Sequence, residues 1–278
     1  MTLSRRDVAG LLEANGLRPS AALGQNFVVD PNTVRRIARL ARVGPGDRVV
    51  EIGAGLGSLT LALAGTGAEV VAVELDRYLT PVLRSIVEPV GVRVVEGDAR
   101  TLAWGEVLGT DDGWALVANL PYNVATPLVL DLLAGVPAIG RMLVMVQREV
   151  GERLAAGAGG NAYGAVSVKL AYRATAKVVG RVPATVFLPR PNVESVLVEV
   201  VRRPAPAVDV DHHELFALVQ AGFAHRRKML RRSLAGLVGP EVFAAAGVRP
   251  EARAEELDIA TWGKLAQCAI DAGGRRPS

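Results

Sequence analysis

Short apolar runs alternate with segments of helical pattern along this chain through about residue 200. The runs at residues 49–52, 69–73, 92–96 and 114–118 are short and apolar, a pattern that predicts buried strands. Residues 31–43 are expected to form a helix, because Asp30 is placed to cap it and Pro31 suits its first turn. The repeated alternation of strand and helix predicts an α/β fold with a doubly wound sheet.

The pattern changes towards the C-terminus. Residues 202–211 are rich in proline and form a candidate hinge, and three or four helical segments are expected across residues 211–272. Residues 1–22 contain an amphipathic piece marked by Val8, Leu11 and Leu12. We therefore expect an N-terminal extension at 1–22, a main α/β domain at 23–203 and a small all-helical domain at 211–272.

A glycine-rich turn follows the first of these strands. Gly53, Gly55 and Gly57 would let the backbone approach a ligand without a Cβ in the way. The spacing departs from the dinucleotide fingerprint, whose third glycine is replaced here by Ser58. Glu51, just before the turn, would repel a pyrophosphate and would suit a cationic ligand such as an amino acid or a sulfonium.

The next two strands also end in carboxylates. Glu74 could accept both hydroxyls of a ribose, and Asp98 could accept the amino group of an adenine. Each has an ordinary alternative, since Glu74 could start the following helix with Asp76 and Asp98 could cap another. A suitable polar group at four consecutive strand ends nevertheless predicts a site for S-adenosylmethionine.

The fourth strand ends in Asn119-Leu120-Pro121-Tyr122. The Asn119 amide oxygen and a backbone carbonyl could accept the two hydrogens of an exocyclic amino group, while the Tyr122 ring could stack on the base. The stretch therefore suits a flat heterocycle that carries an amino group. A plain strand-to-helix turn uses the same residue types, so the tetrapeptide alone leaves both interpretations open.

These motifs, in this order, resemble the family of ribosomal RNA adenine N6-dimethyltransferases. The likeness runs from about residue 23 to residue 266 and includes Leu23-Gly24-Gln25-Asn26-Phe27 and residues 147–150, 187–195 and 223–228. Within the family it is nearest to the housekeeping small-subunit branch, because Leu120 stands where the resistance branch more often has Ile. The chain departs from the family pattern at residues 28–29, 165–166 and 224–225, and the last two departures could alter RNA contacts.

The resemblance implies a class I, Rossmann-like, S-adenosylmethionine-dependent methyltransferase sheet with a small C-terminal helical domain. The donor-binding residues that it implies are Asn26, Val28, Glu51, Gly53, Gly55, Glu74, Leu75, Asp98, Ala99 and Asn119. The target adenine would be held by Asn119, Leu120, Pro121 and Tyr122, with Phe187 on its other face. No strong general base is expected, since the donor arrives as a cation and leaves neutral.

A basic cluster occupies the C-terminal part of the chain. Arg226, Arg227, Lys228, Arg231 and Arg232 are expected to spread over one helix, with no acidic residue within four positions. An isolated cluster of this kind would be a solvated helix face. On the appended domain of an RNA enzyme it predicts phosphate contact, which supplies affinity rather than sequence choice.

Charge, cysteine content and hydropathy bear on the partner and the compartment of the protein. A net charge of +4 does not by itself indicate nucleic acid, and the single cysteine, Cys268, excludes an intramolecular disulfide and fits a reducing compartment. No metal-ligand spacing, signal peptide or apolar run of about 18 residues is present. We expect a cytoplasmic monomer, without metal, that acts on small-subunit rRNA within a pre-30S particle.

Two other classes of function stay open. The first is a related methyltransferase of another target, either a DNA adenine enzyme or a resistance enzyme acting on large-subunit rRNA; the Asp-first motif and target-recognition insert typical of DNA adenine enzymes are not evident here. The second is a non-catalytic RNA-binding or assembly factor on the same fold. Intact Glu51, Glu74, Asp98 and Asn119 argue against lost catalysis.

Overall fold

The computed structural model describes residues 2–109, 112–121 and 124–273, which fold into two compact units. The first unit comprises Met1–Gly151 and Lys177–Arg202, and the second comprises Glu152–Ala176 and Arg203–Ser278. These limits differ from the expected span of 23–203, because Tyr163, Val168 and Tyr172 are buried in the apolar cluster of the second unit. The chain therefore leaves the first unit and returns to it before residue 203.

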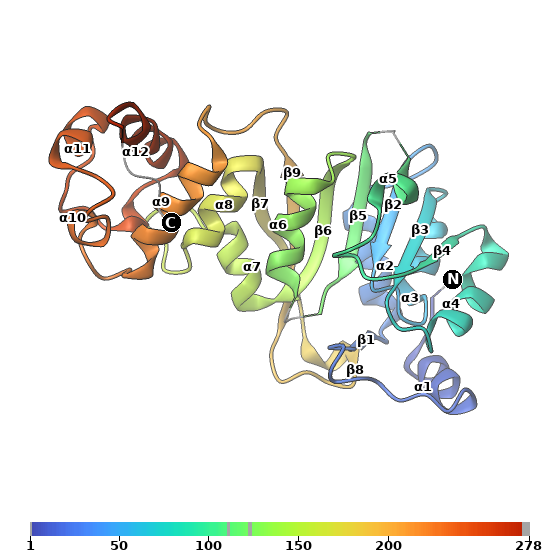
Figure 1. The fold of residues 1–278 in the computed structure, drawn as a ribbon. Coiled ribbons are helices and arrows are strands. Elements are labelled where there is room, and N and C mark those ends of the chain that lie inside the picture. Colours follow the sequence, from blue (N-terminus) through green and yellow to red (C-terminus); the bar gives the residue numbers. More distant parts are fainter. Residues whose placement is uncertain (1, 110–111, 122–123, 274–278) are drawn as a thin grey trace. The chain divides into compact units, whose positions relative to one another are not determined.

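The main sheet is mostly parallel. Within the described residues it has seven strands in the order β4-β3-β2-β5-β6-β9-β7 (Figure 1). Their bounds are β2 (Arg48–Ile52), β3 (Glu69–Glu74), β4 (Arg93–Glu96), β5 (Trp114–Asn119), β6 (Ile139–Gln147), β7 (Ala174–Val182) and β9 (Ser195–Arg202). Strands β4 to β6 pair in parallel, whereas β9 is antiparallel to β6. The strand order reverses between β2 and β5, so the expected doubly wound α/β fold is confirmed.

Helices and a short ribbon complete the first unit. The ribbon pairs β1 (Phe27–Val28) with β8 (Phe187–Leu188) in antiparallel fashion. The helices are α1 (Arg5–Ala14), α2 (Pro31–Ala41), α3 (Ser58–Ala64), α4 (Thr80–Val87), α5 (Trp104–Leu108), α6 (Ala125–Gly135) and α7 (Arg148–Ala155, which continues into the second unit), with 3-10 turns η1 (Glu88–Val90) and η2 (Ala184–Val186).

The start of α2 follows from its sequence. The Asp30 side chain accepts a hydrogen bond from the Thr33 N–H at 2.8 Å, and Pro31 occupies the first turn, as expected. The helix ends at Ala41, earlier than expected, because Arg42 adopts the left-handed conformation at φ 49°. Arg141 donates to the carbonyls of Ala41 and Arg42, which satisfies this helix end.

The second unit is helical. Its elements are α8 (Ala165–Arg173), α9 (His212–Ala224), α10 (Leu230–Ser233), α11 (Pro240–Ala246), η3 (Ala254–Glu256) and α12 (Ile259–Asp271). Trp262, Phe243 and Leu215 are buried at the centre of its apolar cluster. No helix of the described residues has the length and apolar character needed to cross a membrane.

Candidate functional site

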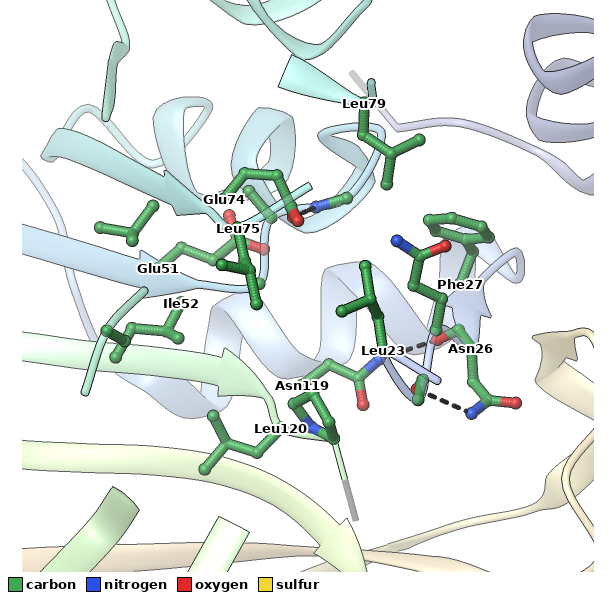
Figure 2. A pocket seen from close by; sticks show the side chains of 18 of the residues that line it. Leu23, Asn26, Phe27, Glu51, Ile52, Glu74, Leu75, Leu79, Asn119 and Leu120 are labelled. Atoms are coloured by element: carbon green, nitrogen blue, oxygen red, sulfur yellow. Dashed lines mark hydrogen bonds between the residues drawn. The ribbon is translucent and has the colours of Figure 1, made fainter. Parts of the chain in front are cut away.

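The carboxyl ends of β2, β3, β4 and β5 surround one pocket of about 280 Å³ (Figure 2). It lies where the strand order reverses, which is the usual ligand position of open α/β sheets. All the residues expected to hold the donor line this pocket: Asn26, Val28, Glu51, Gly53, Gly55, Glu74, Leu75, Asp98, Ala99 and Asn119. Leu120 and Pro121 line it too, so residues expected to bind the donor and residues expected to hold the target base meet at one cavity.

Glu74 and the glycine turn hold each other in place. The carboxylate of Glu74 accepts from the Gly55 N–H at 2.7 Å and from the Asp76 N–H at 2.9 Å. Gly55 has φ +59°, and a Cβ there would come within 3.0 Å of the Phe27 ring. Burial raises the pKa of Glu74, while its N–H partners favour the charged form. Each oxygen keeps acceptor capacity for a ribose hydroxyl.

Glu51 is a buried carboxyl with an unused acceptor. Only 2% of its surface is exposed, and its Oε2 atom has no hydrogen-bond partner among the described residues. Burial raises the pKa of this group to about 8. A buried carboxylate is stabilised when a positive charge comes close to it. The residues present therefore fit a donor that carries an ammonium and a sulfonium group.

Asp98 already has a partner in this structure. Its two carboxylate oxygens accept from the Arg100 side chain at 2.6 and 3.1 Å, and Oδ1 also accepts from the Arg100 backbone N–H at 2.9 Å. These hydrogen bonds lower the pKa of Asp98. Arg100 also lines the pocket. An adenine amino group that approached Asp98 would meet a carboxylate held by this guanidinium.

The Asn119 amide is oriented by the backbone. Its Nδ2 donates to the Asn26 carbonyl at 2.9 Å, which leaves its oxygen as the acceptor available on the pocket rim. The Pro121 carbonyl accepts from the N–H groups of Val124 and Ala125, at the start of α6. Among the described residues no group donates to the Leu120 carbonyl. Leu120 is thus the better candidate for the second acceptor.

The structure describes only one of the two aromatic residues expected around the base. Tyr122 lies outside the described residues, so its stacking role stays a prediction. Phe187 is fully buried in an apolar cluster with Val28 and Ile37, and it does not line the pocket. Its position in β8, paired with β1, directs the ring into the core of the first unit. The stacking role expected of Phe187 stays a prediction, and its ring is buried in this structure.

The basic cluster is not on a single helix, which corrects the expectation from sequence. Helix α9 ends at Ala224, and α10 begins only at Leu230. Residues 225–232 are called the basic turn below. Residues 225–229 leave the helical path, and the backbone N–H groups of Leu230 and Arg231, at the start of α10, donate to the carbonyls of Ala252 and Pro250. This pairing with a distant segment buries Leu230 completely.

The cations of the basic turn fall into two groups. Arg226 forms an ion pair with Glu255 at 2.6 Å and donates to the Asn161 carbonyl at 2.8 Å. Arg231 lies 3.4 Å from Glu251. The remaining three are exposed and have no ion pair in the described part of the chain; they are Arg227, Lys228 and Arg232.

Some pocket residues were not singled out from sequence. Val8 comes from α1. The amphipathic spacing of this segment indicated a buried helix face but not the part of the protein on which that face packs. Gln25 lies in a motif that had been recognised, and its amide donates to Asp76 at 2.7 Å. Nothing in the sequence marked Arg100 as a pocket residue beyond its position two residues after Asp98. No group of three or more His, Cys, Asp or Glu side chains is placed to hold a metal among the described residues.

Comparison with known proteins gives consistent likenesses. The profile of the family described as ribosomal RNA adenine dimethylase matches residues 17–271. The ribosomal RNA small subunit methyltransferase A of Kineococcus radiotolerans is 50% identical over 284 residues, covering 99% of this chain and 93% of that protein. Its namesake from Cutibacterium acnes is 47% identical over 287 residues, covering 98% of this chain and 95% of the other.

Solved structures share the fold. The crystal structure of a dimethyladenosine transferase from Plasmodium falciparum matches with a TM-score of 0.78 at 22% identity, covering 90% of this chain and all (100%) of that one. The 23S rRNA methyltransferase ErmE matches with a TM-score of 0.70 at 23% identity, covering 88% of this chain and 99% of that one. At these identities the likeness concerns the fold alone.

Proposed function

This chain belongs to the ribosomal RNA adenine dimethylase family, and we propose that it dimethylates N6 of two adjacent adenines near the 3′ end of small-subunit (16S) rRNA. It is an S-adenosyl-L-methionine-dependent enzyme. The observation that supports the assignment best is the orientation of Asn119. Its amide nitrogen donates a hydrogen bond to the Asn26 carbonyl, so its amide oxygen is the hydrogen-bond acceptor beside the donor pocket.

The donor would be held by groups from four strand ends. Glu74 suits the ribose hydroxyls, Asp98 the adenine amino group, and Glu51 the positively charged end, while the turn at Gly53 and Gly55 allows close approach. When bound, S-adenosyl-L-methionine supplies a methyl group on a positively charged sulfur and leaves as a neutral thioether.

The chain's own groups would make the adenine nitrogen reactive. The N6 lone pair of adenine is delocalised into the ring, which makes this nitrogen a poor nucleophile. If the Asn119 oxygen and the Leu120 carbonyl accept its two hydrogens, they favour tetrahedral geometry and aim the lone pair at the methyl group. One N6 proton is then lost to water after transfer. Catalysis is mainly orientation and electrostatic stabilisation.

The second methylation uses the same groups. A monomethylated N6 keeps one hydrogen, so only one of the two acceptors can be engaged. The methyl already present must then lie where the other hydrogen was. The base has to leave its stack to reach the pocket, and Tyr122 is our candidate for holding it by stacking.

We further propose that the substrate is a partly assembled small subunit in the cytoplasm, bound by a monomer of this chain. The second unit would hold the RNA by phosphate contacts from the exposed residues of the basic turn, Arg227, Lys228 and Arg232. Such contacts follow RNA shape rather than sequence, which implies poor activity on short naked oligonucleotides.

The test is to offer the purified protein both ribosomal subunits from an unmethylated strain, with labelled donor, and to map the label by mass spectrometry. Up to four methyl groups on two adjacent adenines of the small subunit are expected. Label on a large-subunit adenine would assign the resistance activity instead. Label on neither subunit, with RNA binding retained, would favour a non-catalytic assembly factor.

A further inference from the structure

The N-terminal helix α1 contacts both the donor pocket and the segment that forms β8. Val8 on α1 is buried and lines the donor pocket, within an apolar cluster that includes Phe27, Leu56 and Leu79. Ahead of the helix, the Leu3 N–H donates to the Ser58 hydroxyl at 3.3 Å. The helix is thus packed against the wall of the donor pocket.

Arg5, at the start of α1, joins the helix to β8. One nitrogen of its guanidinium, Nη2, donates to the Thr185 carbonyl at 2.9 Å and to the Phe187 carbonyl at 3.1 Å. Both carbonyls belong to the segment that enters and forms β8. A guanidinium keeps its charge and its planar geometry at all relevant pH values, so it can hold two carbonyls in a fixed relation.

The β8 strand is linked in turn to the acceptor amide. Phe187 and Leu188 pair with Val28 and Phe27 of β1, and the Val29 N–H donates to the Val186 carbonyl at 2.8 Å. Asn26, immediately before β1, provides the carbonyl that receives the Asn119 Nδ2 hydrogen at 2.9 Å. A continuous set of hydrogen bonds therefore runs from Arg5, through a ribbon of only two residue pairs, to Asn119.

We propose that Arg5 is a positioning residue for methyl transfer, which it serves by fixing the β1–β8 ribbon and, through the Asn26 carbonyl, the direction of the Asn119 amide. The role rests on the proposed function, since it assigns to Asn119 the task of accepting from the target amino group. The ribbon is too short to be rigid alone. Displacement of an acceptor by a fraction of an ångström is enough to slow a reaction that depends on orientation.

The experiment compares Arg5→Gln with Arg6→Gln, a matched change at the exposed neighbour on the same helix, and with Arg5→Lys. The first readout is the side-chain NH2 signal of Asn119 in the free, ¹⁵N-asparagine-labelled protein, assigned by its disappearance in Asn119→Ala. We expect this signal to shift or broaden in Arg5→Gln, to stay in place in Arg6→Gln, and to be intermediate in Arg5→Lys.

The second readout is the single-turnover rate with saturating donor and unmethylated small subunits. Arg5→Gln should lower this rate by about tenfold or more, with a KM for the subunit within about twofold and an unchanged salt dependence of binding. Arg5→Lys should recover part of the rate. An unmoved Asn119 signal together with a wild-type rate would overturn the proposal.

The remaining outcomes are also decisive. If Arg5→Gln flattened the salt dependence by about one unit of slope, Arg5 would be a phosphate contact and the positioning role would be wrong. If the wild-type protein methylated neither subunit, the proposed function would fail, while the Asn119 signal of the free protein would still test the link from Arg5.

Discussion

The strand-end pocket of the first unit and the basic turn of the second both gather charged residues, but the two regions use their charges differently. In the pocket, Glu74 binds backbone N–H groups that hold the glycine turn and retains acceptor capacity, while Glu51 keeps one oxygen without a partner in the described residues. In the basic turn, Arg226 and Arg231 pair with carboxylates of their own unit.

This difference shows that charge on a sequence is not the same as charge available to a ligand. A parallel strand end presents its polar group at a fixed edge, so neighbouring strand ends converge wherever the sheet forms. A cluster on a connecting segment has no such constraint, and distant carboxylates can neutralise part of it. Variants in each region can test whether the pocket and the basic turn are divided in this way.

The largest effect is expected at Asn119. Replacing it with alanine removes the oriented amide oxygen, and we expect the methyl-transfer rate to fall by about 100-fold or more with RNA affinity near wild type. Single-turnover kinetics and filter binding on unmethylated small subunits would measure the two quantities. Full turnover with saturating donor would show that Asn119 does not act on the amino group.

The next effect is expected at Glu74. Glu74→Ala removes the acceptor proposed for the ribose and releases the Gly55 N–H, so donor binding should weaken by at least about tenfold. Titration calorimetry measures this, and Glu69→Ala at the exposed start of the same strand serves as the control. Wild-type donor affinity in Glu74→Ala would separate this strand end from the binding site.

A third prediction distinguishes the exposed cations of the basic turn from those held in ion pairs. Joint replacement of Arg227, Lys228 and Arg232 by glutamine should flatten the salt dependence of RNA binding by about one unit of slope for each phosphate group that is no longer neutralised. Arg226→Gln should instead lower the unfolding midpoint, because Glu255 and the Asn161 carbonyl lose their partner.

Binding at several salt concentrations and thermal unfolding of the same variants would compare the two groups. Donor affinity should stay unchanged in all of them, since these residues belong to the second unit. If Arg226→Gln flattened the slope as much as the other changes and left unfolding unaltered, the division into structural and exposed cations would be wrong.

Local sequence patterns predicted the features that depend on nearby residues. The Asp30 cap and Pro31 start of α2, the four strand ends and the glycine turn all follow from residues within a few positions of one another. The parallel sheet then brings the strand ends together without further information. The residues that line the strand-end pocket could therefore largely be predicted from sequence.

The features that sequence missed depend on long-range pairing. The helical spacing of residues 223–234 was overridden when Leu230 and Arg231 paired with residues 250–252. The burial of the Phe187 ring also follows from the pairing of β8 with β1, while its expected role at the base stays a prediction. Likewise, Tyr163 and Tyr172 pack into the second unit although their segment precedes the hinge. No local pattern specifies such partners.

A fourth prediction concerns the buried acid Glu51. Its pKa is raised from 4.5 to about 8, so the folded protein binds this proton more tightly than the unfolded chain. The stability due to the protonated group is therefore fully present below about pH 4.5 and is lost as pH rises through 8. Glu51→Gln, which cannot ionise, should escape this loss.

The measurement is thermal unfolding of the donor-free protein at several pH values. Relative to wild type, Glu51→Gln should gain a few degrees in unfolding midpoint between acid and mildly alkaline pH. Donor affinity should fall in the same variant, because the negative charge opposite the cationic ligand is missing. A midpoint difference that did not change with pH would show that folding does not raise the pKa of Glu51.

The smallest effect is expected at Arg100, where the pocket resembles the basic turn in having a charge already paired. The Arg100 guanidinium donates to both carboxylate oxygens of Asp98, and the adenine amino group of the donor needs one of them. Donor binding must therefore weaken this ion pair, which is half exposed and so contributes little.

Arg100→Ala should strengthen donor binding by about two- to fivefold at low salt, with the gain shrinking as added salt screens the pair. Titration calorimetry at two ionic strengths measures this, and Arg77→Ala, an exposed arginine that does not line the pocket, is the matched control. Weaker binding in Arg100→Ala would mean that the arginine contacts the donor itself, and the strand-end pocket would then use a cation as well as its acids.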